Sequence, residues 1–396
     1  MTSQPVATSR QTRLSRRVRD VPPSGIRRFF DVLATMPDVI SLGVGEPDFD
    51  TPAAIVEAGV RSLRSGRTHY TSNYGTIELR TALAANLERR YDVRYDPERE
   101  VLITVGASEA MSVAMAAIVD PGDEVVLAEP SYVAYVPSIV FNGGTPVLVP
   151  TRAEDGWQLD PDRVEAAITP RTRALFLGYP CNPTGAVLDA ATIRALAAIA
   201  ERHDLLVVSD EIYDRLVYGG HRHEAFSALP GMRERTILLG GFSKAYAMTG
   251  WRVGYACAPA ELLEGMVKVH QYAIMSAPTT AQDAALVGLE EAEQDVQRMV
   301  AEYDRRRRMF VAGLERMGLA TAEPRGAFYA FPRIAGSGLD SVEFSEQLLR
   351  EEHVAVVPGS AFGPSGEGYV RASLATSYEQ LEEALVRIER FLSSSG

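Results

Sequence analysis

Short apolar segments alternate with helical patterns through the middle of the chain, and this alternation restricts the possible folds more than any other feature. Helical patterns cover Ala53–Ser65, Thr76–Arg90 and Ala190–Arg202. Continuous apolar strands joined by helices are typical of a mostly parallel sheet that is covered on both faces. The pattern therefore predicts an α/β fold whose large domain holds a mostly parallel seven-stranded sheet between helices. We expect the strands at Val101–Val105, Glu124–Ala128, Pro146–Val149, Ala174–Gly178, Leu205–Ser209, Ile237–Gly240 and Arg252–Ala256.

The C-terminal part of the chain has a different pattern, which predicts a smaller α+β domain. Gln282–Met317 has the periodicity of one or two long helices, and its basic run Arg305–Arg308 has acidic neighbours, so we expect a solvated helix face there. The elements expected beyond it are strands at Ala327–Phe331, Val354–Val357 and Tyr369–Leu374 and a final helix at Tyr378–Leu392. We expect a disordered leader at 1–13, an N-terminal segment that joins the small domain at 14–52, the large domain at 53–285 and the small domain at 286–396.

The composition argues against several classes of protein. A net charge of −12 does not suit general nucleic-acid binding, which needs a basic surface. No apolar run approaches the roughly 20 residues that span a bilayer, so no membrane role is expected. Cys181 and Cys257 are too few for a disulfide framework and favour a cytoplasmic location. Residues 1–19 contain five arginines and no acid. Transit peptides share that composition, but we expect a disordered leader.

The use of lysine is unusual. Of the 40 lysines and arginines only two, Lys244 and Lys268, are lysines. A guanidinium stays protonated, whereas an amine can lose its proton and attack a carbonyl carbon. Lys268 lies in a helical pattern and is expected to be an ordinary surface residue, so Lys244 is the candidate nucleophile.

Polar or small residues follow five of the expected strands. In open parallel sheets, ligands bind beyond the carboxyl ends of the strands. We therefore expect these residues to meet at one edge of the sheet and form a single site. They are Gly106-Ala107-Ser108, Tyr132, Asn182, Asp210 and Ser243-Lys244.

These residue types suit an aldehyde cofactor that carries a phosphate group. Lys244 could bind such an aldehyde as a Schiff base. Asp210 could keep a ring nitrogen protonated, although an acid at a helix N-cap is the alternative. The helix that starts at Gly106–Ser108 offers N–H groups to a phosphate, Arg252 could add a charge-assisted contact, and Tyr132 could stack on a ring.

Residues from about 14 to 390 resemble the class I and II aminotransferases. These are pyridoxal 5′-phosphate (PLP) enzymes of fold type I, and the likeness is to aspartate and aromatic aminotransferases. The string Ser243–Gly254 is the most specific match. The segments that carry the resemblance are Ser41–Pro52, Tyr70–Gly75, Asn182–Gly185, Ser209–Tyr213, Ser243–Gly254 and Val370–Ser373. The resemblance implies PLP as the cofactor.

The resemblance also implies catalytic and cofactor-binding roles. Lys244 resembles the lysine that binds PLP and moves the proton at the substrate Cα, and Asp210 resembles the partner of the ring nitrogen. Tyr213, with Lys244 and Asp210, completes the expected catalytic set. The other implied contacts are Tyr213 and Asn182 on the phenolic oxygen, Tyr132 on the ring, and Ala107, Ser108, Ser243 and Arg252 on the phosphate.

The substrate site follows from the same resemblance. Arg371 resembles the arginine that binds the substrate α-carboxylate, with Gly45, Tyr132 and Asn182 lining that end of the site. Tyr70 resembles the tyrosine that reaches the phosphate of the neighbouring subunit. The resemblance therefore implies a homodimer with shared active sites.

The implied reaction is the transfer of an amino group from an L-amino acid to a 2-oxo acid such as 2-oxoglutarate. β-Elimination from a sulfur-containing amino acid remains the alternative, because it would use the same Lys244 and Asp210. A PLP-binding regulator is not expected, because the sequence shows no basic helix-turn-helix.

Three further features of the sequence bear on substrate preference and on metal binding. Ser108 stands where aspartate-preferring relatives often carry a lysine, so we do not expect a strict aspartate preference. Ile26, Phe29 and Phe30 lie where similar proteins close over the substrate, which favours an apolar or aromatic side chain. Packing of that segment on the large domain is the alternative. His221 and His223 have no cysteine nearby and make a poor metal site, so no metal is expected.

Overall fold

The computed structural model describes residues 13–23, 36 and 38–394. Seven strands form one sheet in the order β2-β8-β7-β6-β5-β3-β4. All neighbouring pairs are parallel except those of β8, which is antiparallel to both β2 and β7. The predicted α/β fold with a mostly parallel seven-stranded sheet is therefore confirmed. The strands are β2 (Val101–Thr104), β3 (Glu124–Glu129), β4 (Thr145–Pro150), β5 (Thr172–Gly178), β6 (Leu206–Asp210), β7 (Thr236–Gly241) and β8 (Gly254–Cys257).

Strand β8 begins two residues later than the apolar pattern predicted. Arg252 has a φ of +54°, in the left-handed region, and this backbone conformation cannot continue a strand. The extended segment therefore starts at Gly254, and Arg252 is left in the turn before it, beside the edge where the other strands end.

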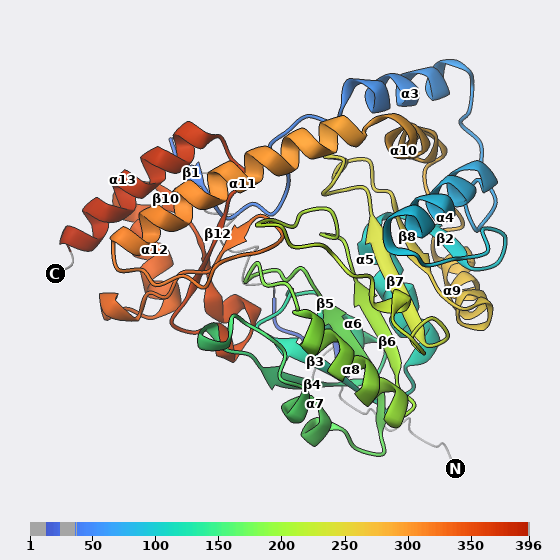
Figure 1. The fold of residues 1–396 in the computed structure, drawn as a ribbon, viewed down its shortest axis with the longest axis horizontal. Helices are drawn as coiled ribbons and strands as arrows, with labels where there is room; N and C mark the ends of the chain where they lie inside the picture. The colour runs from blue at the N-terminus through green and yellow to red at the C-terminus, as the bar shows by residue number, and fades with distance from the viewer. Residues whose placement is uncertain (1–12, 24–35, 37, 395–396) are drawn as a thin grey trace, which may run out of the picture.

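Helices cover both faces of the sheet (Figure 1). On β5, Ala174 and Phe176 point into the core beneath α5, α6 and α9, whereas Leu175 and Leu177 point into the core beneath α7 and α8. This alternation follows from the two-residue period of a strand and explains why the run is apolar throughout. The covering helices are α5 (Gly106–Ile118), α6 (Tyr135–Phe141), α7 (Pro161–Ala167), α8 (Ala190–Arg202) and α9 (Ala260–Ala273).

A second layer of helices lies beyond β2. Helices α3 (Ala53–Arg64) and α4 (Ile77–Tyr91) both pack against α10 (Thr279–Glu291). The long pattern predicted at 282–317 is two helices, because the chain breaks at Ala292 before α11 (Glu293–Arg316). In Figure 1, α11 runs from α10 towards the C-terminal helices. The expected domain boundary after residue 285 falls within α10 and remains a prediction.

The C-terminal part contains two small sheets. Strands β11 (Val357–Pro358), β12 (Val370–Ser373) and β9 (Tyr329–Ala330) form an antiparallel sheet, and β1 (Ile40–Ser41) pairs in parallel with β10 (Val354–Ala355). The single strand predicted at 354–357 is thus two short strands with different partners. Helices α12 (Ser341–Glu352) and α13 (Tyr378–Ser394) pack together beside them, and the shorter helices are α1 (Arg16–Arg19) and the 3₁₀ turns Ala153–Asp155, Phe226–Ala228, Ala335–Ser337, Gly359–Phe362 and Pro364–Gly366. Among the described residues, no helix is long and apolar enough to cross a membrane.

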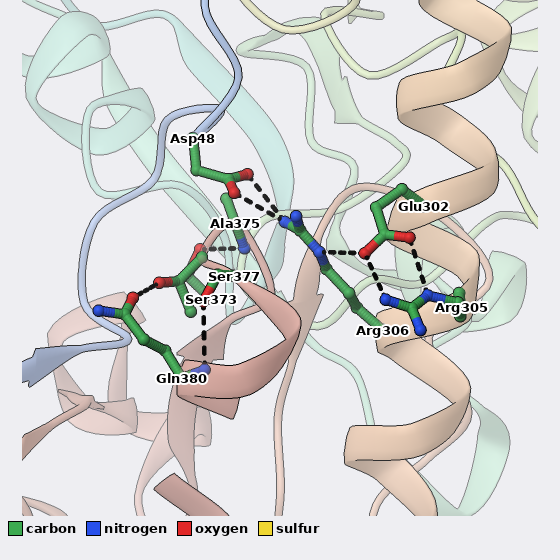
Figure 2. Close-up of polar contacts among 9 residues, drawn as sticks. Asp48, Glu302, Arg305, Arg306, Ser373, Ala375, Ser377 and Gln380 are labelled. Carbon is green, nitrogen blue, oxygen red and sulfur yellow. Dashed lines mark hydrogen bonds and ion pairs between the residues drawn. The ribbon is translucent and has the colours of Figure 1, made fainter. Parts of the chain in front are cut away.

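The basic run on α11 corrects a prediction. Arg306 and Arg307 are buried and only their neighbours in the run face solvent, because each buried guanidinium has carboxylate partners. Arg306 donates from Nη1 to both oxygens of Asp48, at 2.8 and 3.0 Å, and from Nε to Glu302 at 2.9 Å (Figure 2). The ion pair between Arg306 and Asp48 therefore connects the N-terminal segment to α11. Nearby, at the end of β12, the Ser373 hydroxyl oxygen accepts a hydrogen bond from the Ala375 N–H, and the Ser377 hydroxyl oxygen accepts one from the Gln380 N–H.

Candidate active site

A cavity of about 600 Å³ lies where the carboxyl ends of the parallel strands face the N-terminal segment and the small sheet of β9 and β12. The structure brings eleven of the predicted site residues together in its lining. They are Gly45, Ala107, Ser108, Tyr132, Asn182, Asp210, Tyr213, Ser243, Lys244, Arg252 and Arg371. Tyr70 is not among them: it is 81% exposed and lies in a separate surface depression.

Lys244 stands three residues beyond β7 and is half-buried. Its Nζ donates to the carbonyl oxygen of Gly45 at 2.5 Å. The pKa of Lys244 is lowered to about 8, mainly by burial; the positive charges of Arg371 and Arg252 act in the same direction, and Glu46 opposes them. A substantial fraction of the amine is therefore neutral near pH 8, as a nucleophile requires.

Asp210 is the last residue of β6, and its carboxyl is buried. Oδ2 accepts a hydrogen bond from the Tyr135 hydroxyl at 2.9 Å, and Oδ1 accepts one from the Ile212 N–H at 3.2 Å. Burial raises the pKa of Asp210 to about 6, although both hydrogen bonds act against the rise. A buried carboxylate without a cation in contact is costly, so the site favours a ligand that brings a positive charge to Asp210.

The space for Tyr135 depends on a glycine. A Cβ built on Gly178, at the end of β5, would lie 2.4 Å from the Tyr135 hydroxyl oxygen. Any side chain there would displace the hydroxyl that bonds Asp210. No role for Tyr135 was predicted from the sequence. Its position three residues after Tyr132, at the start of a helix, was the only available signal.

Arg371 on β12 is buried and has few partners. Nη1 donates to Asn182 Oδ1 at 2.9 Å and Nη2 to the Gly43 carbonyl at 2.7 Å, whereas the buried Nε has no hydrogen-bond partner. The guanidinium lies 4.5 Å from the ring centroid of Tyr329, and burial lowers the pKa of Arg371. Two of the five N–H donors are held by neutral acceptors and three remain, including that of Nε, which suits a bidentate anion such as a carboxylate.

A second guanidinium lies at the start of α5. A Cβ on Gly106, which has a φ of +73°, would lie 2.5 Å from Arg252 Nη2, so only glycine allows this close approach. Gly106 is the first residue of α5, and no side chain caps the N-terminus of this helix. The N–H groups of Ala107 and Ser108, the positive end of the helix and Arg252 are chemically suited to hold an anion. Within the described ranges, neither Arg252 nor Arg371 forms an ion pair with a carboxylate.

Two tyrosines in the lining of the cavity contact each other. The hydroxyls of Tyr213 and Tyr329 are 2.8 Å apart, and burial raises the pKa of both phenols. Both therefore stay protonated through the neutral range and can donate hydrogen bonds. Gly45 again leaves room, because a Cβ there would lie 2.6 Å from the Tyr329 hydroxyl oxygen. Tyr329 and the nearby Glu46 also line the cavity, and neither was predicted from the sequence to belong to the site.

Comparison with known proteins agrees with this geometry. The family model described as aminotransferase class I and II matches residues 37–388. The chain belongs to this family. It is an enzyme, an aminotransferase, as the sequence resemblance predicted.

The aminotransferase aligns with its relatives over almost its full length. It is 47% identical to an aspartate aminotransferase of Pyrococcus abyssi and 45% identical to the aromatic-amino-acid aminotransferase 2 of Thermococcus litoralis. In each comparison the alignment covers 96% of this chain and 98% of the relative. A crystal structure of an aromatic aminotransferase from Pyrococcus horikoshii matches with a TM-score of 0.89 and 47% identity, covering 92% of this chain and 99% of the other.

Other predicted residues of the aminotransferase lie outside the cavity. Lys268 pairs with Glu264 on the surface of α9 at 3.1 Å, in keeping with the ordinary role expected for it. His221 is exposed and His223 bonds Glu211. In the part of the chain that the structure describes, no group of three or more His, Cys, Asp or Glu could hold a metal ion. Ile26, Phe29 and Phe30 fall outside the described residues.

Proposed function

We propose that the aminotransferase moves the amino group of an L-amino acid to a 2-oxo acid such as 2-oxoglutarate, with PLP bound in the cavity around Lys244. The observation that carries the proposal is that this one cavity joins a half-buried amine, a buried carboxyl and two arginines without carboxylate partners among the described residues. The unpaired Nε of Arg371 and the uncapped N-terminus of α5 beside Arg252 suit two anions, the substrate carboxylate and the cofactor phosphate.

Each residue has a defined task towards the cofactor. When bound, PLP supplies a conjugated ring that withdraws electrons from the substrate Cα. Asp210 holds the proton on the ring nitrogen, because a carboxylate at that atom favours its charged form. Tyr213 and Asn182 would donate hydrogen bonds to the phenolic oxygen, and Tyr132 would contact the ring. Ala107, Ser108, Ser243 and Arg252 would hold the phosphate.

The substrate is held at the opposite end of the cavity. Arg371 binds the α-carboxylate, with Asn182 and the backbone at Gly43 fixing the guanidinium plane. Lys244 Nζ would take the proton from the substrate Cα and hold it for the return transfer. Its pKa of about 8 suits both transfers near neutral pH, because neither protonation state is strongly favoured.

We further propose a broad amino-acid range that includes aromatic side chains. Among the described residues that line the cavity, the only Lys or Arg side chains are Lys244, Arg252 and Arg371, and each has a task already. Glu46 adds a negative charge, which disfavours a second carboxylate on the substrate. Relatives named for aspartate and for aromatic substrates at similar identity support a range rather than one substrate. A kcat/KM for tyrosine at least as high as that for aspartate is expected, and turnover of aspartate alone would contradict it.

We also propose a homodimer in the cytoplasm. The exposed Tyr70 side chain is the support for a shared site, because it projects from the surface rather than into its own cavity. Mixing inactive Tyr70→Ala and Lys244→Ala chains should restore activity, because a mixed dimer has one intact site. No recovery after subunit exchange would refute sharing.

The first experiment measures the visible spectrum of the protein with PLP. Lys244→Ala is the test and Lys268→Ala is a matched control, because these are the only two lysines. Wild type and Lys268→Ala should show a visible band that an amino-acid substrate bleaches and 2-oxoglutarate restores. Borohydride should fix the cofactor on the peptide containing Lys244. An unchanged band in Lys244→Ala, or a label on Lys268, would overturn the proposal.

A further inference from the structure

A second group of charged side chains lies behind the turn that carries Asp210 and Tyr213. Glu211 is 3% exposed and accepts hydrogen bonds from the Ser209 hydroxyl at 2.9 Å and the Phe226 N–H at 3.0 Å. Its other oxygen lies 2.6 Å from Nε2 of His223, whose side chain is 8% exposed. These partners fix Glu211 from three directions.

The same turn is held again three residues later. Asp214 accepts a hydrogen bond from the Tyr91 hydroxyl at 2.6 Å, and the edge of the Tyr91 ring packs on His223 with centroids 5.3 Å apart. We call Glu211, Asp214, His223 and Tyr91 the Glu211 cluster. Asp210 and Tyr213 line the active-site cavity, whereas Glu211 and His223 line a separate cavity of about 340 Å³. Successive residues of the turn therefore line two different cavities.

The charge of Glu211 affects the pKa of Asp210 in the active site. Burial alone would lower the pKa of His223, but the negative charges of Glu211, Asp214 and Glu224 raise it above its ordinary value, which favours the protonated imidazole beside Glu211. Burial is the main reason that the pKa of Asp210 is raised, and the negative charge of Glu211 adds to it. Whatever neutralises Glu211 therefore helps Asp210 to ionise.

We propose that Glu211 and His223 are positioning residues for the cofactor site. Their buried charge pair fixes the turn that carries Asp210 and Tyr213, and the charge of His223 offsets that of Glu211 so that Asp210 remains a carboxylate. This inference rests on the proposed role of Asp210 beside the cofactor ring. It adds no group that touches the substrate.

The test compares three matched substitutions, His223→Gln, Glu211→Gln and His221→Gln. His221 is exposed in the same loop and serves as the control. The dissociation constant of PLP is measured from pH 5 to 8 on cofactor-free protein, since binding needs Asp210 ionised. The titrations of PLP itself are common to all variants. The measured quantity is the pH below which the affinity for PLP is lost, which we call the pH limit.

The two test variants should move this limit in opposite directions. His223→Gln leaves the charge of Glu211 unopposed, so affinity should be lost at higher pH; Glu211→Gln removes that charge, so the limit should fall. Each pKa unit corresponds to about a tenfold change in affinity below the limit. A purely structural role would weaken binding at every pH without opposite displacements.

Three results decide the matter. Opposite displacements with an unchanged His221→Gln support the inference, whereas no displacement, or displacement in one direction for both, overturns it. If His223→Gln does not fold, Glu211→Gln alone decides, since a limit that is unchanged or raised overturns the inference. If wild type and His221→Gln fail to bind PLP, the proposed function has failed instead.

Discussion

Tyr135→Phe offers a quantitative test of how the fold controls Asp210. The pKa of Asp210 rises from 3.8 to about 6 in the folded chain, so at about 1.4 kcal/mol per unit the ionised carboxyl costs the cofactor-free protein about 3 kcal/mol. Between these two values the folded state binds a proton that the unfolded state has released. Stability therefore falls as the pH rises through this window, and the cost is complete above about pH 6.

Removing the Tyr135 hydroxyl should extend this window. Its hydrogen bond lowers the pKa of Asp210, and a bond to a charged group contributes about 1.5–3 kcal/mol, or about one to two pKa units. The stability of Tyr135→Phe should therefore continue to fall up to about pH 7–8, where the wild-type contribution from Asp210 is already constant.

Urea unfolding of the cofactor-free proteins at several pH values measures the difference. The free energy of unfolding of wild type minus that of Tyr135→Phe should be constant below about pH 5 and grow by about 1.5–3 kcal/mol towards pH 8. Titrations elsewhere in the chain cancel in this difference. In an Asp210→Asn background the growth should vanish. A difference that stays constant from pH 5 to 8 would refute the reasoning.

Three further predictions test the remaining contacts. Arg371→Lys loses the fixed pair of donors, so KM for the amino acid should rise by about 10- to 100-fold at little cost in cofactor affinity, as steady-state kinetics and PLP titration will show; an unchanged KM would remove Arg371 from the substrate site. Gly178→Ala should displace the Tyr135 hydroxyl and shift the pH dependence of stability in the same direction as Tyr135→Phe, and a variant that titrates like wild type would mean that the β5 end can relax. Arg306→Leu leaves Asp48 without its partner and should lower the free energy of unfolding by about 1–3 kcal/mol, whereas the exposed neighbour Arg308→Leu should change it by less than about 0.5 kcal/mol.

The sequence predicted the assembly of the site because parallel strands end at a common edge. Lys244, Asp210, Asn182 and Tyr132 each follow a separate strand, so the topology alone brings them together. The order of the patterns along the chain is enough to place these residues at one edge, and no distance is needed.

Contacts between side chains from distant elements were not predictable in this way. Tyr135 meets Asp210 only because Gly178 leaves space, and the burial of Arg306 depends on where Asp48 lies. Neither fact has a local signal. The late start of β8 reflects the backbone of Arg252, and a pattern of apolar residues does not report a positive φ.

The pairing of β1 with β10 has a consequence for synthesis of the chain. Ile40 pairs with Val354, so its partner strand is made about 300 residues later. At roughly 5–20 residues per second, the first segment waits about 15–60 s for that strand. During that time Ile40 and Leu42, which are buried in the finished protein, have no final place to pack. The nascent chain therefore presents an unpaired apolar segment near its start until translation is almost complete, and fragments that end before residue 354 lack both this pairing and the Arg371 end of the active site.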